Sequence, residues 1–89
     1  MECFVKIVVD GETNDELWSQ IDSIEEIQMV ERSRTACQAV SYYRVEEGDL
    51  GNALRKLGAY GEAVELDAGE KRELMIRYNT MQRIAAARL

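Results

Sequence analysis

In two stretches of the chain, successive side chains divide between two faces in the pattern that is typical of β-strands. Residues 3–9 are rich in β-branched types and place four side chains on one face, Cys3, Val5, Ile7 and Val9. Residues 36–45 alternate in the same way, with Cys37, Ala39, Ser41, Tyr43 and Val45 on one face. A shorter apolar stretch at 62–66 predicts a further strand, with Val64 and Leu66 facing inward.

Three other stretches repeat apolar residues at helical spacing. Between the first two strands, Leu17, Ile21 and Ile24 predict an amphipathic helix that ends near residues 23–25. Thr13 and Glu16 have the spacing of a capping box at its start. A short helix is expected between Asp49, as its N-cap, and Gly58, as its stop signal.

The last helix starts from a second capping-box spacing, Asp67 and Glu70, and runs to the end of the sequence. Along it one apolar stripe recurs every three or four residues, formed by Leu74, Tyr78, Met81, Ala85 and Leu89.

Residues 26–31 fit two patterns. Ile27 and Met29 alternate with polar residues as in a strand, whereas Ile24, Ile27 and Val30 could continue the preceding helix. We favour the strand, with a turn over residues 32–35.

The resulting order is β-α-β-β-α-β-α within a single domain, residues 1–89. We therefore predict an α+β fold of the ferredoxin-like type: an antiparallel β-α-β-β-α-β sheet with an additional C-terminal helix. If residues 26–31 were helical, a three-stranded α+β or a parallel α/β arrangement would replace it. In the ferredoxin-like case Cys3 and Cys37 lie at opposite ends of adjacent strands, too far apart for a disulfide, and we expect buried reduced thiols.

The composition narrows the chemistry. The sequence has no histidine, which removes the commonest general base and the commonest metal ligand, and its two cysteines are far apart. We therefore expect no catalytic residues, no metal site and no cofactor. No apolar run approaches a membrane span, and no signal-peptide pattern opens the sequence, so a cytoplasmic protein is expected.

Charge is distributed unevenly. Residues 1–31 hold nine acids against one base, whereas residues 68–89 hold five bases against two acids. The net charge of −6 argues against direct binding of nucleic acid, and the aromatic pattern of RNA-binding sheets is only faintly echoed. The asymmetry instead favours a protein partner.

Two surfaces are the candidate contact sites. The first is the acidic side of the first helix and the residues just after it, namely Asp15, Trp18, Asp22, Glu25 and Glu26. Tryptophan is enriched among interface anchors, although a Trp at the border of an apolar stripe also fits the edge of a core. The second surface is the stripe of the last helix, Leu74, Tyr78, Met81 and Ala85, which could bind a partner helix or form a homodimer.

These features favour a small, acidic, non-enzymatic protein-binding module that regulates or inhibits a protein partner through its acidic helix face. In size and charge it resembles small phage-encoded anti-defence proteins that occupy the nucleic-acid-binding groove of a target. The alternative is a regulatory domain that senses a small ligand as a homodimer.

Overall fold

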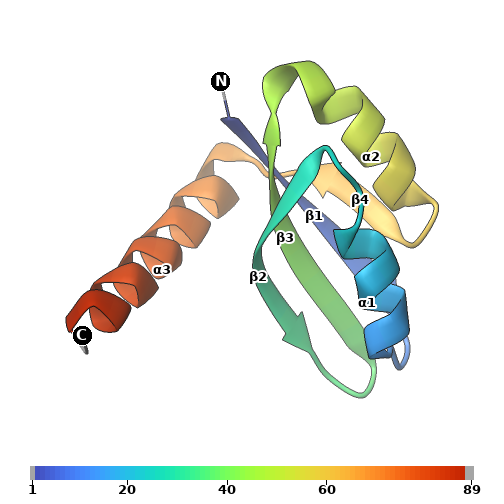
Figure 1. The fold of residues 1–89 in the computed structure, drawn as a ribbon, viewed down its shortest axis with the longest axis horizontal. Coiled ribbons are helices and arrows are strands. Elements are labelled where there is room, and N and C mark those ends of the chain that lie inside the picture. The colour runs from blue at the N-terminus through green and yellow to red at the C-terminus, as the bar shows by residue number, and fades with distance from the viewer. Residues whose placement is uncertain (1, 88–89) are drawn as a thin grey trace.

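The computed structural model describes residues 2–87 of the chain, arranged as four strands and three α-helices (Figure 1). In chain order they are β1 (Glu2–Asp10), α1 (Asp15–Asp22), β2 (Ile27–Arg34), β3 (Gln38–Glu46), α2 (Leu50–Gly58), β4 (Glu62–Glu65) and α3 (Ala68–Ala87). A short 3-10 turn, Glu47–Asp49, leads into α2.

The strands form one antiparallel sheet in the order β2-β3-β1-β4. Strand β1 is central and pairs along its whole length with β3, from Glu2 opposite Glu46 to Asp10 opposite Gln38. The α+β class and the antiparallel sheet are therefore confirmed.

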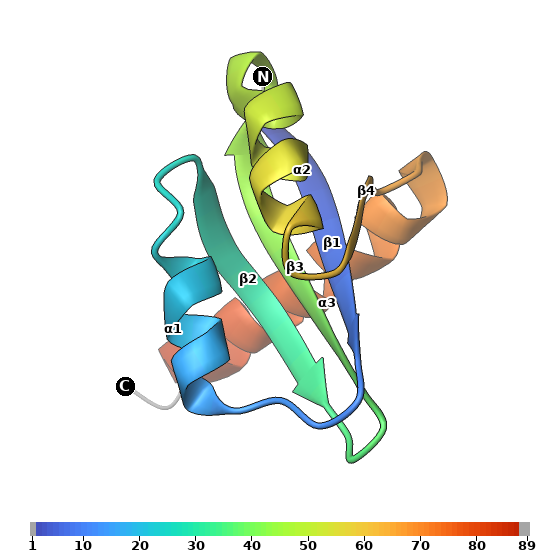
Figure 2. The same ribbon diagram turned by 90° about the vertical axis from the view of Figure 1, so that its right-hand side faces the viewer.

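The two faces of the sheet are covered differently (Figure 2). Helices α1 and α2 lie on the face that carries Val5, Ile7 and Val9, which we call the inner face. Helix α3 crosses the opposite, outer face, where Phe4, Leu66 and Leu74 form a small second core. The inner face thus holds the main core and the outer face only a minor one.

Residues 26–31 resolve as strand. Strand β2 begins at Ile27 and extends to Arg34, so the turn to β3 lies at residues 35–37 and not at 32–35. A β-bulge between Met29 and Glu31 shifts the pairing with β3 by one residue. The bulge lets Ile27 and Arg32 both face inward although five residues separate them, which a regular alternation would forbid.

The ends of α1 differ from the prediction. Asn14, not Thr13, is the N-cap, and its side-chain oxygen accepts a hydrogen bond from the Leu17 N–H at 2.8 Å. The helix ends at Asp22, earlier than expected. Thr13 is occupied otherwise, because its hydroxyl accepts a hydrogen bond from Trp18 Nε1 at 2.9 Å.

The predicted signals around the later helices were partly wrong. Asp49 precedes α2 but makes no side-chain cap, and Gly58 is the last residue of that helix and does not follow it. Asp67 does accept a hydrogen bond from the Glu70 N–H, at 2.8 Å. The Glu70 carboxylate does not reach back to complete a capping box and pairs instead with Lys6, 2.6 Å away.

Both cysteines are free, and they lie toward opposite ends of the β1–β3 pair, as the predicted topology required. The expectation that they are buried was wrong, since Cys3 is half-buried and Cys37 is exposed. Cys37 lies in the β2–β3 turn, where its carbonyl accepts a hydrogen bond from Gly11 N–H at 2.7 Å.

Helix α3 is the longest element, with 20 residues. Of the helices that the structure describes, none is both long and apolar enough to cross a lipid bilayer.

Candidate functional site

The structure places Trp18 in the main core. Its side chain is only 2% exposed and packs with the inner-face residues of the sheet. The Arg32 guanidinium covers the ring, 4.2 Å from its centroid, and Thr13 accepts the indole N–H. The ring is therefore closed off from solvent and does not present a surface anchor.

Asp22 belongs to a polar cluster on the inner face. Tyr43 donates its hydroxyl hydrogen to Asp22 Oδ1 at 2.7 Å, and Arg32 forms an ion pair with the same carboxylate. Arg32 also donates to the oxygens of Tyr43, at 3.1 Å, and Ser41, at 3.2 Å. The cluster satisfies the polar groups of the buried residues Ser41 and Tyr43, so it is structural.

The electrostatics of this cluster follow from burial. Burial raises the pKa of Tyr43, and its hydrogen bond to Asp22 acts in the same direction. For Arg32 burial alone would lower the pKa, but its bonds to Asp22 and Tyr43 outweigh burial and raise it. The cation is thus held charged against the Trp18 ring.

Two further acids of the predicted face are also paired within the fold. Asp15 lies 3.0 Å from Arg34, although the carboxylate remains almost fully exposed. Glu26 Oε1 accepts from Lys56 Nζ at 2.6 Å, and this bond lowers the pKa of Glu26. Of the five predicted residues, only Glu25 is an exposed side chain that forms no ion pair within the described chain.

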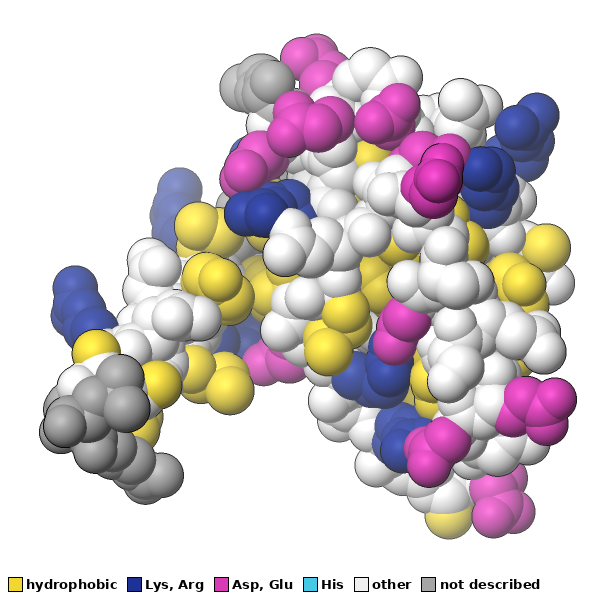
Figure 3. Space-filling view, viewed as in Figure 1, with side chains coloured by type: hydrophobic (Ala, Val, Ile, Leu, Met, Phe, Trp, Pro, Cys, Tyr) yellow, Lys and Arg dark blue, Asp and Glu magenta, His cyan; other side chains and the backbone are white. Residues whose placement is uncertain are grey.

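Glu25 and Glu26 lie beside a hollow at the end of the sheet where β2 begins and β3 ends. We call it the acidic hollow. It has a volume of about 220 Å³ and is lined by Glu25, Glu26, Ile27, Gln28, Arg44, Val45, Glu46 and Asp49. Figure 3 shows acidic side chains gathered at the corresponding end of the molecule.

The lining of the acidic hollow is mostly acidic, with four carboxylates and one arginine, Arg44. Since the half-buried Ile27 contributes apolar surface, the hollow suits a group with a positive head and an apolar stem, such as a lysine or arginine side chain. The sequence pattern did not point to Glu46 and Asp49, because these two residues lie more than twenty positions along the chain from Glu25.

The stripe of α3 divides into two halves. Leu74 is 1% exposed and is the only side chain of α3, among those described, that is buried. Tyr78, Met81 and Ala85 are exposed although they continue the same stripe. Arg88 and Leu89 lie outside the described residues.

Ile76 and Ile84 add exposed apolar surface on other sides of α3, 60% and 48% accessible. A signal for Ile84 existed in the sequence, because between Asn79 and Ala86 this helix carries only one charged residue, Arg83. Figure 3 shows this part of the helix standing clear of the body of the molecule.

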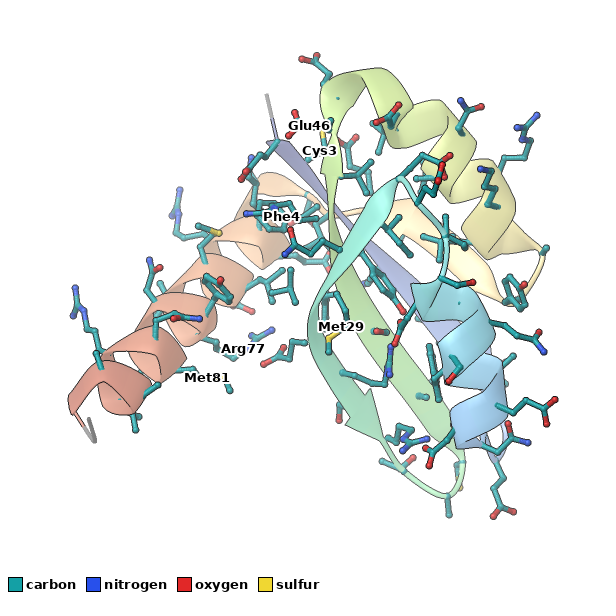
Figure 4. All side chains as sticks on the ribbon, in the orientation of Figure 1. Cys3, Phe4, Met29, Glu46, Arg77 and Met81 are labelled. Carbon is teal, nitrogen blue, oxygen red and sulfur yellow. The ribbon has the colours of Figure 1, made fainter. Side chains whose placement is uncertain are left out.

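A smaller hollow of about 70 Å³ lies where α3 meets the sheet. Apolar side chains line most of it, including Phe4, Met29, Met75 and Tyr78. Figure 4 shows Arg77 reaching from α3 toward β2, where it forms an ion pair with Glu31 at 2.9 Å. Both hollows are smaller than the roughly 300–1,000 Å³ of ordinary small-molecule sites.

Comparison of the chain with protein-family models, with curated proteins and with solved structures found no match.

Proposed function

We propose that this chain is a small, acidic, non-enzymatic protein-binding module that regulates or inhibits its partner. The absence of histidine from the sequence and the small size of both hollows favour binding over catalysis. The partner is a protein that presents basic side chains, for example those that line a nucleic-acid-binding groove.

One observation carries this proposal: four carboxylates, those of Glu25, Glu26, Glu46 and Asp49, line the acidic hollow against one base, Arg44. This excess of negative charge would attract a lysine or arginine of the partner. The half-buried Ile27 would contact the apolar stem of the same side chain.

The proposed contact therefore lies at the acidic hollow and not over the whole acidic face that the sequence predicted. Asp15 and Asp22 already have arginine partners and Trp18 is in the core, so these three are not part of the proposed contact. Glu25 and Glu26 keep the role that the sequence suggested and are joined by Asp49.

We also infer that the fold is of the ferredoxin-like type. The strand order β2-β3-β1-β4, with β1 between β3 and β4, supports this inference. So does the position of α1 and α2 on the same face, each connecting strands that are not neighbours. A superfold of this kind hosts many functions, so the proposed function depends on the hollow and not on the fold.

The test reverses two exposed carboxylates at the hollow, Glu25→Lys together with Asp49→Lys, and leaves the Glu26–Lys56 pair intact. Partner proteins are captured from the native host with the wild-type chain, identified by mass spectrometry, and titrated against the variant. Because both carboxylates attract a basic partner, we expect at least a tenfold weaker affinity for the captured protein.

The matched control reverses two other exposed carboxylates, Glu12→Lys together with Glu16→Lys, which changes the net charge by the same amount. It should retain most of the affinity. Equal loss in both variants would show that only total charge matters, and unchanged binding in the hollow variant would refute the proposal.

A further inference from the structure

Helix α3 carries apolar side chains on more sides than the rest of the molecule covers. Its apolar residues point in several directions: Leu74, Tyr78 and Met81 on one side, Ile76 and Ile84 on others. Helices in proteins are stabilised mainly by packing of an apolar face against the rest of the molecule. Here residues 76–86, which we call the free half of α3, contribute no buried side chain.

The outer face of the sheet has a matching uncovered region. Val8 and Val40 are register partners on this face, are only half-buried, and belong to neither core cluster. Ser33 and Glu62 flank them on the neighbouring strands and are exposed. We call these four residues the open half of the outer face. Figure 1 shows α3 and the sheet diverging on this side.

The molecule exposes more surface than a compact monomer of its size. Its accessible surface is 6025 Å², whereas a 10.1 kDa monomer exposes about 5,300 Å². The excess of about 700 Å² is close to the roughly 800 Å² that each partner buries in a specific interface. Its radius of gyration, 13.4 Å, also exceeds the value of about 12 Å that is typical of this length.

The two uncovered surfaces are complementary in charge. Arg83 forms no ion pair with any described residue, whereas Arg77, the other arginine of the free half of α3, is already paired with Glu31. The free half carries no acid. The open half of the outer face carries Glu62, also without an ion pair among the described residues, and Asp10 lies next to it on the same face. The apolar side chains and Arg83 of the free half of α3 therefore match the valines and carboxylates of the open half of the outer face.

Because both surfaces belong to the same chain, we propose that their occupant is a second copy of this chain. The free half of α3 from each copy packs on the open half of the outer face of the other, with Met81 and Ile84 over Val8 and Val40, and Arg83 near Glu62. A two-fold axis makes the two contacts identical and closes the assembly as a dimer. This inference concerns a different surface from the acidic hollow and stands independently of the proposed function.

The test is light scattering coupled to size exclusion, over protein concentrations from about 1 μM to 1 mM. The wild-type chain is expected to reach twice its mass of 10.1 kDa within this range. Met81→Asp should shift the midpoint at least a hundredfold, because it buries an unpaired charge at the contact. Ala59→Asp, an exposed position after α2 on the inner side, is the matched control and should leave the midpoint unchanged.

A charge exchange tests the orientation. Arg83→Glu and Glu62→Arg should each weaken association roughly tenfold, and the double variant should restore it to within a few fold. A mass that stays at one copy throughout would overturn the proposal, as would a dimer that survives Met81→Asp. A dimer that Met81→Asp disrupts but the double variant does not rescue would overturn the helix-on-sheet arrangement, and a helix-to-helix contact would replace it.

Discussion

Helices α1 and α3 each carry a regular apolar stripe, yet the fold treats the two stripes in opposite ways. In α1 Trp18 and Ile21 are buried, and Asp15 and Asp22 form ion pairs with arginines of β2. Among the described side chains of α3 only Leu74 is buried, while Met81 is 62% exposed. Helix α1, whose acids stand out in the sequence, is thus packed on the sheet. Helix α3, whose apolar stripe is typical of a core helix, leaves much of that stripe exposed.

The difference comes from what lies opposite each helix. Helix α1 is eight residues long and fits within the inner face, which α2 shares. Helix α3 has 20 residues, about 30 Å at 1.5 Å per residue, and crosses the outer face diagonally. It therefore extends beyond the part of the sheet that it covers, and Met81 and Ala85 of its stripe stay exposed.

The largest expected contrast is between the central side chains of the two stripes. Trp18→Ala should lower the free energy of unfolding by about 3–5 kcal/mol, because it empties a core site. Met81→Ala should change it by less than about 0.5 kcal/mol in urea denaturation at low protein concentration, where the chain is monomeric. Similar losses in the two variants would show that α3 is as well packed as α1.

The next contrast lies within α3 itself. Leu74→Ala removes the buried side chain of α3 in the second core and should lower the free energy of opening this helix by about 2–4 kcal/mol. Hydrogen exchange should then quicken at α3 amides, while amides of β1 and β3 keep their protection. Uniform acceleration across both regions would contradict the view that α3 opens separately.

A smaller contrast separates two carboxylates of α1. Asp22→Ala leaves Arg32 and Tyr43 without their acceptor, and we expect a loss of about 1–3 kcal/mol. Asp15→Ala removes an exposed pair and should cost less than about 0.5 kcal/mol. Thermal unfolding of the two variants measures the difference, and equal losses would mean that the inner-face cluster contributes nothing special.

The smallest effect is a dependence on pH. Because the folded state raises the pKa of Tyr43, the unfolded chain loses that proton first, near pH 10. The stability from Tyr43 is therefore complete below about pH 10 and declines as the pH rises further. Denaturation between pH 8 and 11 should show a shallower decline for Tyr43→Phe than for the wild type, and a steeper one would reverse the sign of the argument.

Local patterns predicted the strands and helices, but the inward face of β4 was wrong, because Ala63 packs on the main core and Val64 is exposed. The alternation in residues 3–9 and 36–45 identified the two central strands, and the face that carries Val5 and Ile7 is the buried one. The boundaries failed where two residues could serve the same role: Asn14 caps α1 because the Thr13 hydroxyl is engaged by Trp18.

The candidate site could be predicted only in part. Glu25 and Glu26 are adjacent in sequence, but Asp49 joins them through the return of β3 along the sheet. The bulge at Met29, which turns Arg32 toward Trp18, leaves no mark in the alternation. Contacts between residues far apart in the chain decide both features.

The sequence by itself determined the order of the elements, the sign and the uneven distribution of charge, and the apolar side of each helix, because these depend on residue type and local period. Only the tertiary structure decided which charges are neutralised and which stripes are covered. Pairing and burial each require a second surface, and its position depends on the whole chain. Most of the acids that stood out in the sequence pair with bases from other elements, whereas the free half of α3 contributes no buried side chain.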